Sequence, residues 1–115
     1  MWTSEFYLTR LYPVQNQALR LITDLGTEFY LTGGTALSRG YLNHRFSDDL
    51  DFFVNRASAR AADPQFAKWC DIIASALGQS PLWDAQVIVR QDYFMRIMLI
   101  TADDIALKIE FVNDV

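Results

Sequence analysis

Two aspartates separated by one residue, Asp49 and Asp51, are the side chains in this sequence best placed to do chemistry. They alternate with Leu50, Phe52 and Val54, which predicts a β-strand with both carboxylates on one face and the apolar side chains on the other. Their Cα atoms would be about 6.5 Å apart, and carboxylates this close repel each other unless they share a cation or a proton. Because Mg²⁺ favours one or two carboxylates together with phosphate oxygens, the pair indicates a magnesium site. The alternative is a solvated strand edge.

A glycine pair, Gly33 and Gly34, lies upstream between the apolar run 29–31 and the segment 35–39. This order predicts a strand, a glycine turn and a short helix, where the backbone can approach a ligand because no Cβ stands in the way. The unpaired N–H groups at the helix start suit phosphate oxygens, and Thr35 could add a hydroxyl or cap the helix. Phosphates at the glycines and a metal at the aspartates describe a nucleoside triphosphate site. For the glycines, the alternative is a plain turn.

The glycine pair and the aspartates together resemble a known signature. Gly33-Gly34, followed by RFSDDLDF from Arg45 to Phe52, resembles the DNA-polymerase-β-type nucleotidyltransferases, and most of all the N-terminal core of the AbiEii/AbiGii-type toxin branch. The resemblance implies a Mg²⁺-dependent or Mn²⁺-dependent enzyme that moves a nucleoside monophosphate from a nucleoside triphosphate to an acceptor hydroxyl. It implies an acceptor that is RNA, such as a tRNA end, or a protein, and it fits the toxin of a toxin–antitoxin pair.

Arg45 and Ser47, just before the aspartates, are candidate phosphate ligands by the same resemblance. Arg45 could instead pair with Asp48, which points away from Asp49, and Ser47 could instead shape the entry to the strand. Basic side chains around this unit form either a docking patch for an RNA acceptor or ordinary solvated surface: Arg39, His44, Arg45, Arg56 and Arg60.

Glu110 is the candidate third acid. The family usually has an Asp on a later strand, and Glu110 in the run LKIEF looks like its counterpart with a longer side chain. Strand alternation puts Lys108 and Glu110 on the face opposite Leu107 and Ile109. By this resemblance, Asp49, Asp51 and Glu110 are the expected catalytic and metal-binding residues, and Lys108 is an expected phosphate contact. The alternative is an ordinary surface pair of Lys108 with Glu110.

The elements that position these residues predict one α/β (α+β) domain, a minimal nucleotidyltransferase-like core over residues 1–115. The sheet is expected to be mixed and mostly antiparallel, with helices on one face and the site on the other. A helix at 2–11 precedes a second that contains Pro13, stops at Gly26 and buries Val14, Ala18, Ile22 and Leu25. Asp63 caps a helix that ends at Gly78 and buries Phe66, Trp69, Cys70, Ile73 and Leu77. The expected segments are N-terminal helices in 1–26, the glycine and aspartate unit 28–55, a helix at 63–78, and strands 85–90, 94–100 and 105–112 within 85–112.

Composition limits the setting. The net charge of −4 argues against a protein that coats nucleic acid, and no apolar run is long enough for a membrane span. A single cysteine, Cys70, and the lack of a secretory signal favour the cytoplasm.

Members of the resembled family usually continue beyond this core into a helical region, whereas this sequence ends shortly after Glu110. It is expected to be a minimal core, a fragment, or a protein completed by a partner such as an antitoxin, and an exposed sheet edge would favour a homodimer. The competing interpretation is a catalytically lapsed core that binds a nucleotide or a partner protein.

Overall fold

The computed structural model describes residues 5, 7–31, 49–55 and 63–113. Its helices are η1 (Tyr7–Leu11), α2 (Tyr12–Asp24) and α4 (Pro64–Gln79). Its strands are β1 (Tyr30–Leu31), β2 (Asp49–Val54), β3 (Asp84–Gln91), β4 (Phe94–Ile100) and β5 (Ala106–Asn113).

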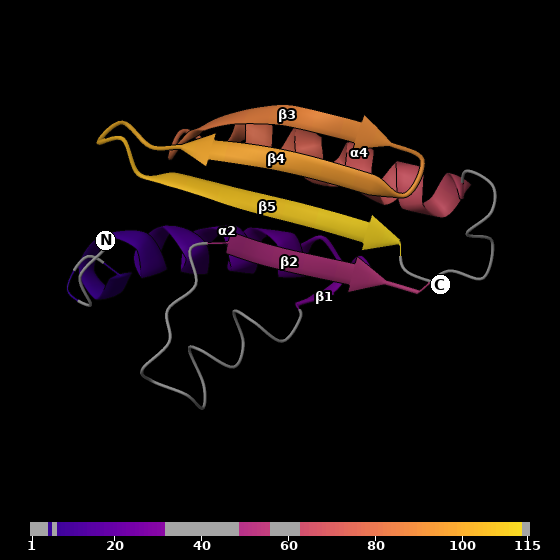
Figure 1. Cartoon of the computed structure of the whole chain (residues 1–115), viewed down its shortest axis with the longest axis horizontal. Helices are drawn as coiled ribbons and strands as arrows, with labels where there is room; N and C mark the ends of the chain where they lie inside the picture. Colours follow the sequence, from indigo (N-terminus) through magenta and orange to yellow (C-terminus); the bar gives the residue numbers. More distant parts are fainter. Residues whose placement is uncertain (1–4, 6, 32–48, 56–62, 114–115) are drawn as a thin grey trace.

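The strands form one five-stranded sheet in the order β1-β2-β5-β4-β3. β3, β4 and β5 make the predicted antiparallel meander, β1 pairs antiparallel with β2, and β2 pairs parallel with β5. Figure 1 shows α2 and α4 on the same side of the sheet, behind the strands, with the other side facing the viewer. The predicted mixed, mostly antiparallel sheet with helices on one face is confirmed. We call the side opposite α2 and α4 the open face.

Strand alternation separates the core from the open face. On β5, Leu107, Ile109 and Phe111 are buried against the helices, while Lys108 and Glu110 are half-buried on the other side. On β2 the residues of the helix face are likewise buried and the aspartates between them are half-buried. This is the arrangement expected of a sheet whose core lies on one side only.

An aromatic cluster ties the early and late parts of the chain together. The ring of Phe111 stacks on Phe52 at a centroid distance of 5.3 Å and meets Phe29 edge-on at 5.2 Å. Phe29 also packs against Phe66 of α4 at 5.7 Å. Residues from both ends of the sequence therefore share one core.

The N-terminal helices differ from the prediction in two respects. There is no break before Pro13, because η1 runs directly into α2 and proline fits the first turn of a helix. Gln15 is fully buried on α2, whereas Val14 is only half-buried. Gln15 shares the helix face of Ala18 and Ile22, and its polar side chain concealed this position in the sequence. The stop at Gly26 is confirmed, since its φ of +71° is a conformation that glycine adopts without strain.

The predicted cap of α4 is confirmed, because the Asp63 carboxylate accepts hydrogen bonds from the N–H groups of Gln65 and Phe66. The predicted end at Gly78 is wrong by one residue. Gly78 stays in the helix, and the extended Ser80 ends it by donating its N–H to the Leu77 carbonyl at 3.3 Å. The stripe of α4 is buried as predicted, including Cys70, with Trp69 half-buried at its edge.

Candidate active site on the open face of the sheet

The parallel pairing of β2 with β5 brings three carboxylates to one face. In this register Asp51 lies opposite Glu110, and Asp49 lies opposite Lys108. Because residues opposite each other in neighbouring strands point to the same side, Glu110 lies beside the two aspartates although about sixty positions separate them in sequence. The predicted juxtaposition is therefore present, and the role of each residue stays a prediction.

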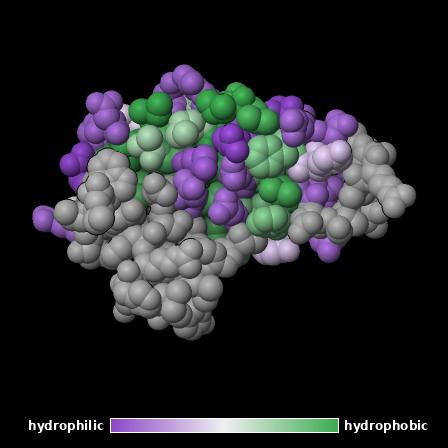
Figure 2. Space-filling model, in the orientation of Figure 1, coloured by the Kyte–Doolittle hydropathy of each residue, from purple (hydrophilic) through white to green (hydrophobic). Residues whose placement is uncertain are grey.

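Two basic side chains of the same face neutralise part of this acid group. Lys108 Nζ lies 3.3 Å from Asp49 Oδ2, and Arg96 Nε donates to Glu110 Oε2 at 2.6 Å. The resulting row runs across three strands, from Asp51 on β2 through Glu110 on β5 to Arg96 on β4. Figure 2 shows hydrophilic side chains gathered in the middle of this view, with hydrophobic ones beside them.

Arg96 is the residue of this row that was not predicted from the sequence. The signal was available, because Arg96 lies between Met95 and Ile97, two apolar residues of β4 that are buried in the core. Alternation would have placed Arg96 on the open face, and its partner follows only from the register of β4 with β5.

The electrostatics of Asp51 show how crowded the acids are. Burial is the main cause that raises the pKa of Asp51 above 3.8, and the neighbouring carboxylates of Glu110 and Asp49 raise this pKa further, while Lys108 opposes them. A shared proton or an added cation would reduce the repulsion between carboxyl groups in these surroundings. A cation bound at this face would therefore relieve the crowding of the carboxylates.

The donor set fits a hard divalent cation in kind, since Mg²⁺ takes oxygen ligands and favours carboxylates. Among the described residues, no group of three or more His, Cys, Asp or Glu side chains is arranged to hold a metal ion. In the present arrangement Asp49 pairs with Lys108 and Glu110 pairs with Arg96. Metal binding by Asp49, Asp51 and Glu110 stays a prediction.

The predicted phosphate-binding half of the site falls outside the described residues. This applies to Gly33, Gly34, Thr35, Arg45 and Ser47, and also to Arg39, His44, Arg56 and Arg60 of the basic cluster. Of the expected phosphate contacts, only Lys108 is placed by the structure, beside Asp49.

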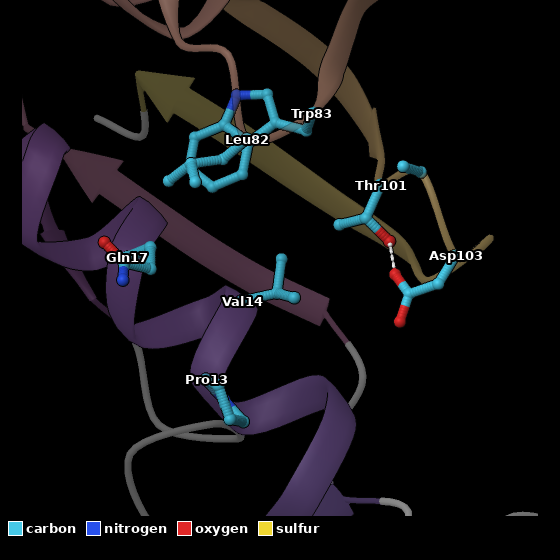
Figure 3. Close-up of a pocket in the computed structure, with 8 residues that line it drawn as sticks. Pro13, Val14, Gln17, Leu82, Trp83, Thr101 and Asp103 are labelled. Atoms are coloured by element: carbon cyan, nitrogen blue, oxygen red, sulfur yellow. Dashed lines mark hydrogen bonds between the residues drawn. The ribbon is translucent and has the colours of Figure 1, made fainter.

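A separate pocket of about 280 Å³ lies away from the acids (Figure 3). It opens between the first turn of α2, at Pro13 and Val14, and the two connections that carry Trp83 and Thr101. None of the three carboxylates lines it, and its walls are mainly apolar. This pocket is therefore not part of the candidate active site.

Comparison with known proteins decides the family. The sequence model of the family described as "Nucleotidyl transferase AbiEii toxin, Type IV TA system" matches residues 18–114. The chain belongs to the AbiEii nucleotidyltransferase toxin family. The predicted resemblance is confirmed.

The individual relatives match either a smaller part of this chain or only a part of their own length. An uncharacterized protein of Aquifex aeolicus is 50% identical over 49 residues, which are 41% of this chain and 23% of that protein. The solved structure of JHP933 from Helicobacter pylori is 25% identical with a TM-score of 0.54, over 91% of this chain and 45% of its own. The nucleotidyltransferase toxin MenT4 of Mycobacterium tuberculosis is 17% identical with a TM-score of 0.63, over 90% of this chain and 37% of its own.

This chain of the AbiEii family therefore spans less than half the length of these solved structures. The likeness to MenT4 shows that the fold is that of a nucleotidyltransferase core. Within the described part of the chain, no helix has both the length and the apolar character needed to cross a membrane.

Proposed function

We propose that this AbiEii-family chain carries the catalytic core of a Mg²⁺-dependent nucleotidyltransferase, which transfers a nucleoside monophosphate from a nucleoside triphosphate to an acceptor hydroxyl. The observation that carries the proposal is the row of carboxylates on the open face, with Asp51 opposite Glu110 and Asp49 one alternation away. Acids in this arrangement match what phosphoryl-type transfer needs, because carboxylates can hold the metal that positions the phosphates for attack by the acceptor hydroxyl.

The proposal assigns a role to each side chain. Asp49, Asp51 and Glu110 would hold the divalent cation, which supplies neutralisation of the charge that develops on the phosphates. Glu110 would also orient the acceptor hydroxyl and take up its proton. Lys108 would leave Asp49 for a phosphate oxygen. Phosphates would be held by a larger set outside the described residues: Gly33, Gly34, Thr35, Arg45 and Ser47.

The family supports a proposal for the acceptor and the partner. Its description names a toxin of a type IV toxin–antitoxin system, and MenT4 is titled a nucleotidyltransferase toxin. We therefore propose that the acceptor hydroxyl belongs to RNA, such as a tRNA end, or to a protein, and that an antitoxin is the cognate partner. The cytoplasm, where nucleoside triphosphates are found, is the proposed setting.

The test is calorimetric titration of each Mg²⁺–nucleoside triphosphate into the wild type and into the Asp49→Ala/Asp51→Ala variant. We expect metal-dependent binding in the wild type and its loss in the variant, because the variant lacks two of the three carboxylates. The control is Asp84→Ala/Asp92→Ala, which removes the same charge from exposed acids of β3 and its turn. Equal binding by the wild type and the Asp49→Ala/Asp51→Ala variant, with both folded, would refute the assignment.

A second function, a nucleotide-binding or partner-binding module without turnover, is favoured by one observation. Asp49 and Glu110 are already paired with Lys108 and Arg96, as expected for acids that no longer load a metal. Incubating the protein with labelled nucleoside triphosphates and with RNA and protein acceptors distinguishes the two functions. Labelled product that requires Asp49 and Asp51 supports the enzyme, while nucleotide binding without product in every case supports the binding module.

A further inference from the structure

Arg96 is attached to the acid group by a short ion pair. Its Nε lies 2.6 Å from Glu110 Oε2, and the Glu110 side chain is only 19% exposed. The Arg96 guanidinium carbon also lies 5.4 Å above the centre of the Phe94 ring, a cation–π contact that restricts the guanidinium plane. Arg96 is therefore fixed from two sides, by an aromatic ring and by a half-buried carboxylate.

Arg96 approaches Glu110 from the side away from the aspartates. β5 lies between β2 and β4, so Glu110 has Asp51 as its neighbour on one strand and Arg96 as its neighbour on the other. Lys108, in contrast, lies two residues before Glu110 on β5, opposite Asp49, and its Nζ contacts the Asp49 carboxylate. Arg96 balances the charge of the row from its outer end and occupies no position between the three carboxylates.

A second arginine of the same sheet provides a comparison. Arg90 on β3 binds Asp71 of α4 at 2.9 Å and the Ala67 carbonyl at 3.1 Å. The Asp71 side chain is 73% exposed, so solvent screens its pair with Arg90. An exposed pair of this kind contributes little to stability. The pair of Arg96 with Glu110 differs because a second carboxylate, Asp51, lies beside the acceptor.

We propose that Arg96 is the resident counter-ion of the third carboxylate: in the metal-free chain it balances the charge that a divalent cation balances in the loaded site. Arg96 is then a positioning residue, which holds Glu110 beside Asp51 while no metal is bound. The inference rests on the proposed function, since it takes Asp49, Asp51 and Glu110 as the cation ligands. It adds a residue on β4 to a site otherwise built from β2 and β5.

The physical reason is the cost of crowded like charges. Without Arg96, the half-buried carboxylate of Glu110 would face Asp51 and would lose the positive partner that it has on β4. Added Mg²⁺ would restore the balance, and a ligand that binds only the folded chain stabilises it by an amount that rises with the logarithm of its affinity. Removing Arg96 should therefore weaken the metal-free fold and enlarge the stabilisation that Mg²⁺ provides.

The experiment compares thermal unfolding of the wild type and Arg96→Gln, first with the metal chelated and then with millimolar Mg²⁺. In the chelated state we expect Arg96→Gln to lower Tm by about 3–6 °C, the shift that about 1 kcal/mol produces in a domain of this size. With Mg²⁺ we expect at least half of this loss to be regained, a larger rise in Tm than the wild type shows. A sodium salt of the same ionic strength should not reproduce the gain, because screening acts weakly on a half-buried pair.

Three variants make the outcome specific. Arg96→Lys keeps the charge and should stay close to the wild type. Arg90→Gln removes the comparison arginine and should gain no more from Mg²⁺ than the wild type does. Arg96→Gln combined with Glu110→Gln should recover stability in the chelated state and lose the extra response to Mg²⁺, since the unbalanced carboxylate is gone.

The inference is overturned if Arg96→Gln is as stable as the wild type in the chelated state, or if Mg²⁺ raises the Tm of both proteins equally. It is also overturned if Arg90→Gln gains as much as Arg96→Gln. Failure of the proposed function gives a different pattern: nucleotide binding is then indifferent to Asp49→Ala/Asp51→Ala, whatever Arg96→Gln does. Mg²⁺ alone is the only ligand required, so no acceptor has to be known.

Discussion

The acid–base properties of Asp51 depend on its surroundings. Its carboxyl group is partly buried and faces Glu110 across the pair of β2 with β5, and both conditions disfavour its charged form. In these surroundings the charged Asp51 carboxylate lowers the stability of the metal-free chain, and a bound cation would offset this cost. Stability and function therefore make opposite demands on this side chain.

This conflict predicts that Asp51→Asn stabilises the metal-free chain at neutral pH. The pKa of Asp51 is raised in the folded state above 3.8, so the folded chain holds this proton more tightly than the unfolded chain does. The resulting stabilisation is complete below the unfolded value and is lost as the pH rises through the folded one. At pH 7 we expect the amide to raise the free energy of unfolding by roughly 0.5 kcal/mol, a small gain because solvent screens a partly exposed group.

Urea unfolding of the chelated proteins at acidic and neutral pH measures this difference. The gain of Asp51→Asn over the wild type should shrink as the pH falls towards 4, while Asp92→Asn, in the exposed turn after β3, should give a small and constant effect. A wild type more stable than Asp51→Asn at neutral pH, without metal, would contradict the crowding of acids described above.

At the scale of the elements, α4 depends on a single capping side chain. Asp63 is almost fully buried and accepts N–H hydrogen bonds at 2.8 and 3.4 Å from the first turn of α4. We expect Asp63→Ala to lower the free energy of unfolding by about 1 kcal/mol, the usual cost of losing such a cap. Chemical denaturation measures it, and Asp71→Ala, an exposed acid in the middle of the same helix, is the control. An equal effect of the two substitutions would show that the cap contributes nothing specific.

The elements and a mostly antiparallel sheet were predicted from local patterns, whereas the parallel register of β2 with β5 was not. Alternation predicted the strand that carries Glu110 within one residue of its ends and put Asp51 on a strand, because each pattern is complete within a short window. The parallel register that sets Asp51 opposite Glu110 joins segments far apart in the chain, and no local pattern encodes it. The contact between Arg96 and Glu110 needed one further step, the register fixed by the connection at 101–105.

At the scale of the whole molecule, the last strand occupies the centre of the sheet. β5 lies between β2 and β4, and its buried face meets both helices, so the early and late parts of the chain complete one core. The candidate site depends on this arrangement directly, since Asp51 comes from β2, Glu110 from β5 and Arg96 from β4. Integrity of the site and integrity of the fold are therefore linked through β5.

Phe111 is the residue that tests this link. It is fully buried on β5 and contacts Phe52 on β2 and Phe29 just before β1. We expect Phe111→Ala to cost about 3–5 kcal/mol, a large part of the roughly 5–15 kcal/mol that stabilises a typical domain. The control is Tyr93→Ala, an aromatic residue that is 48% exposed, whose hydrogen bond to Asn113 uses only its main-chain carbonyl.

Urea unfolding followed by both tryptophan fluorescence and far-ultraviolet circular dichroism distinguishes one cooperative unit from two. A single, coincident and strongly shifted transition supports the linked core, because the meander of β3, β4 and β5 with α4 would then lose its structure together with β2. Two separate transitions, or a shift no larger than that of Tyr93→Ala, would mean that the meander folds without β2 and that Asp51 and Glu110 can part while most of the molecule stays folded.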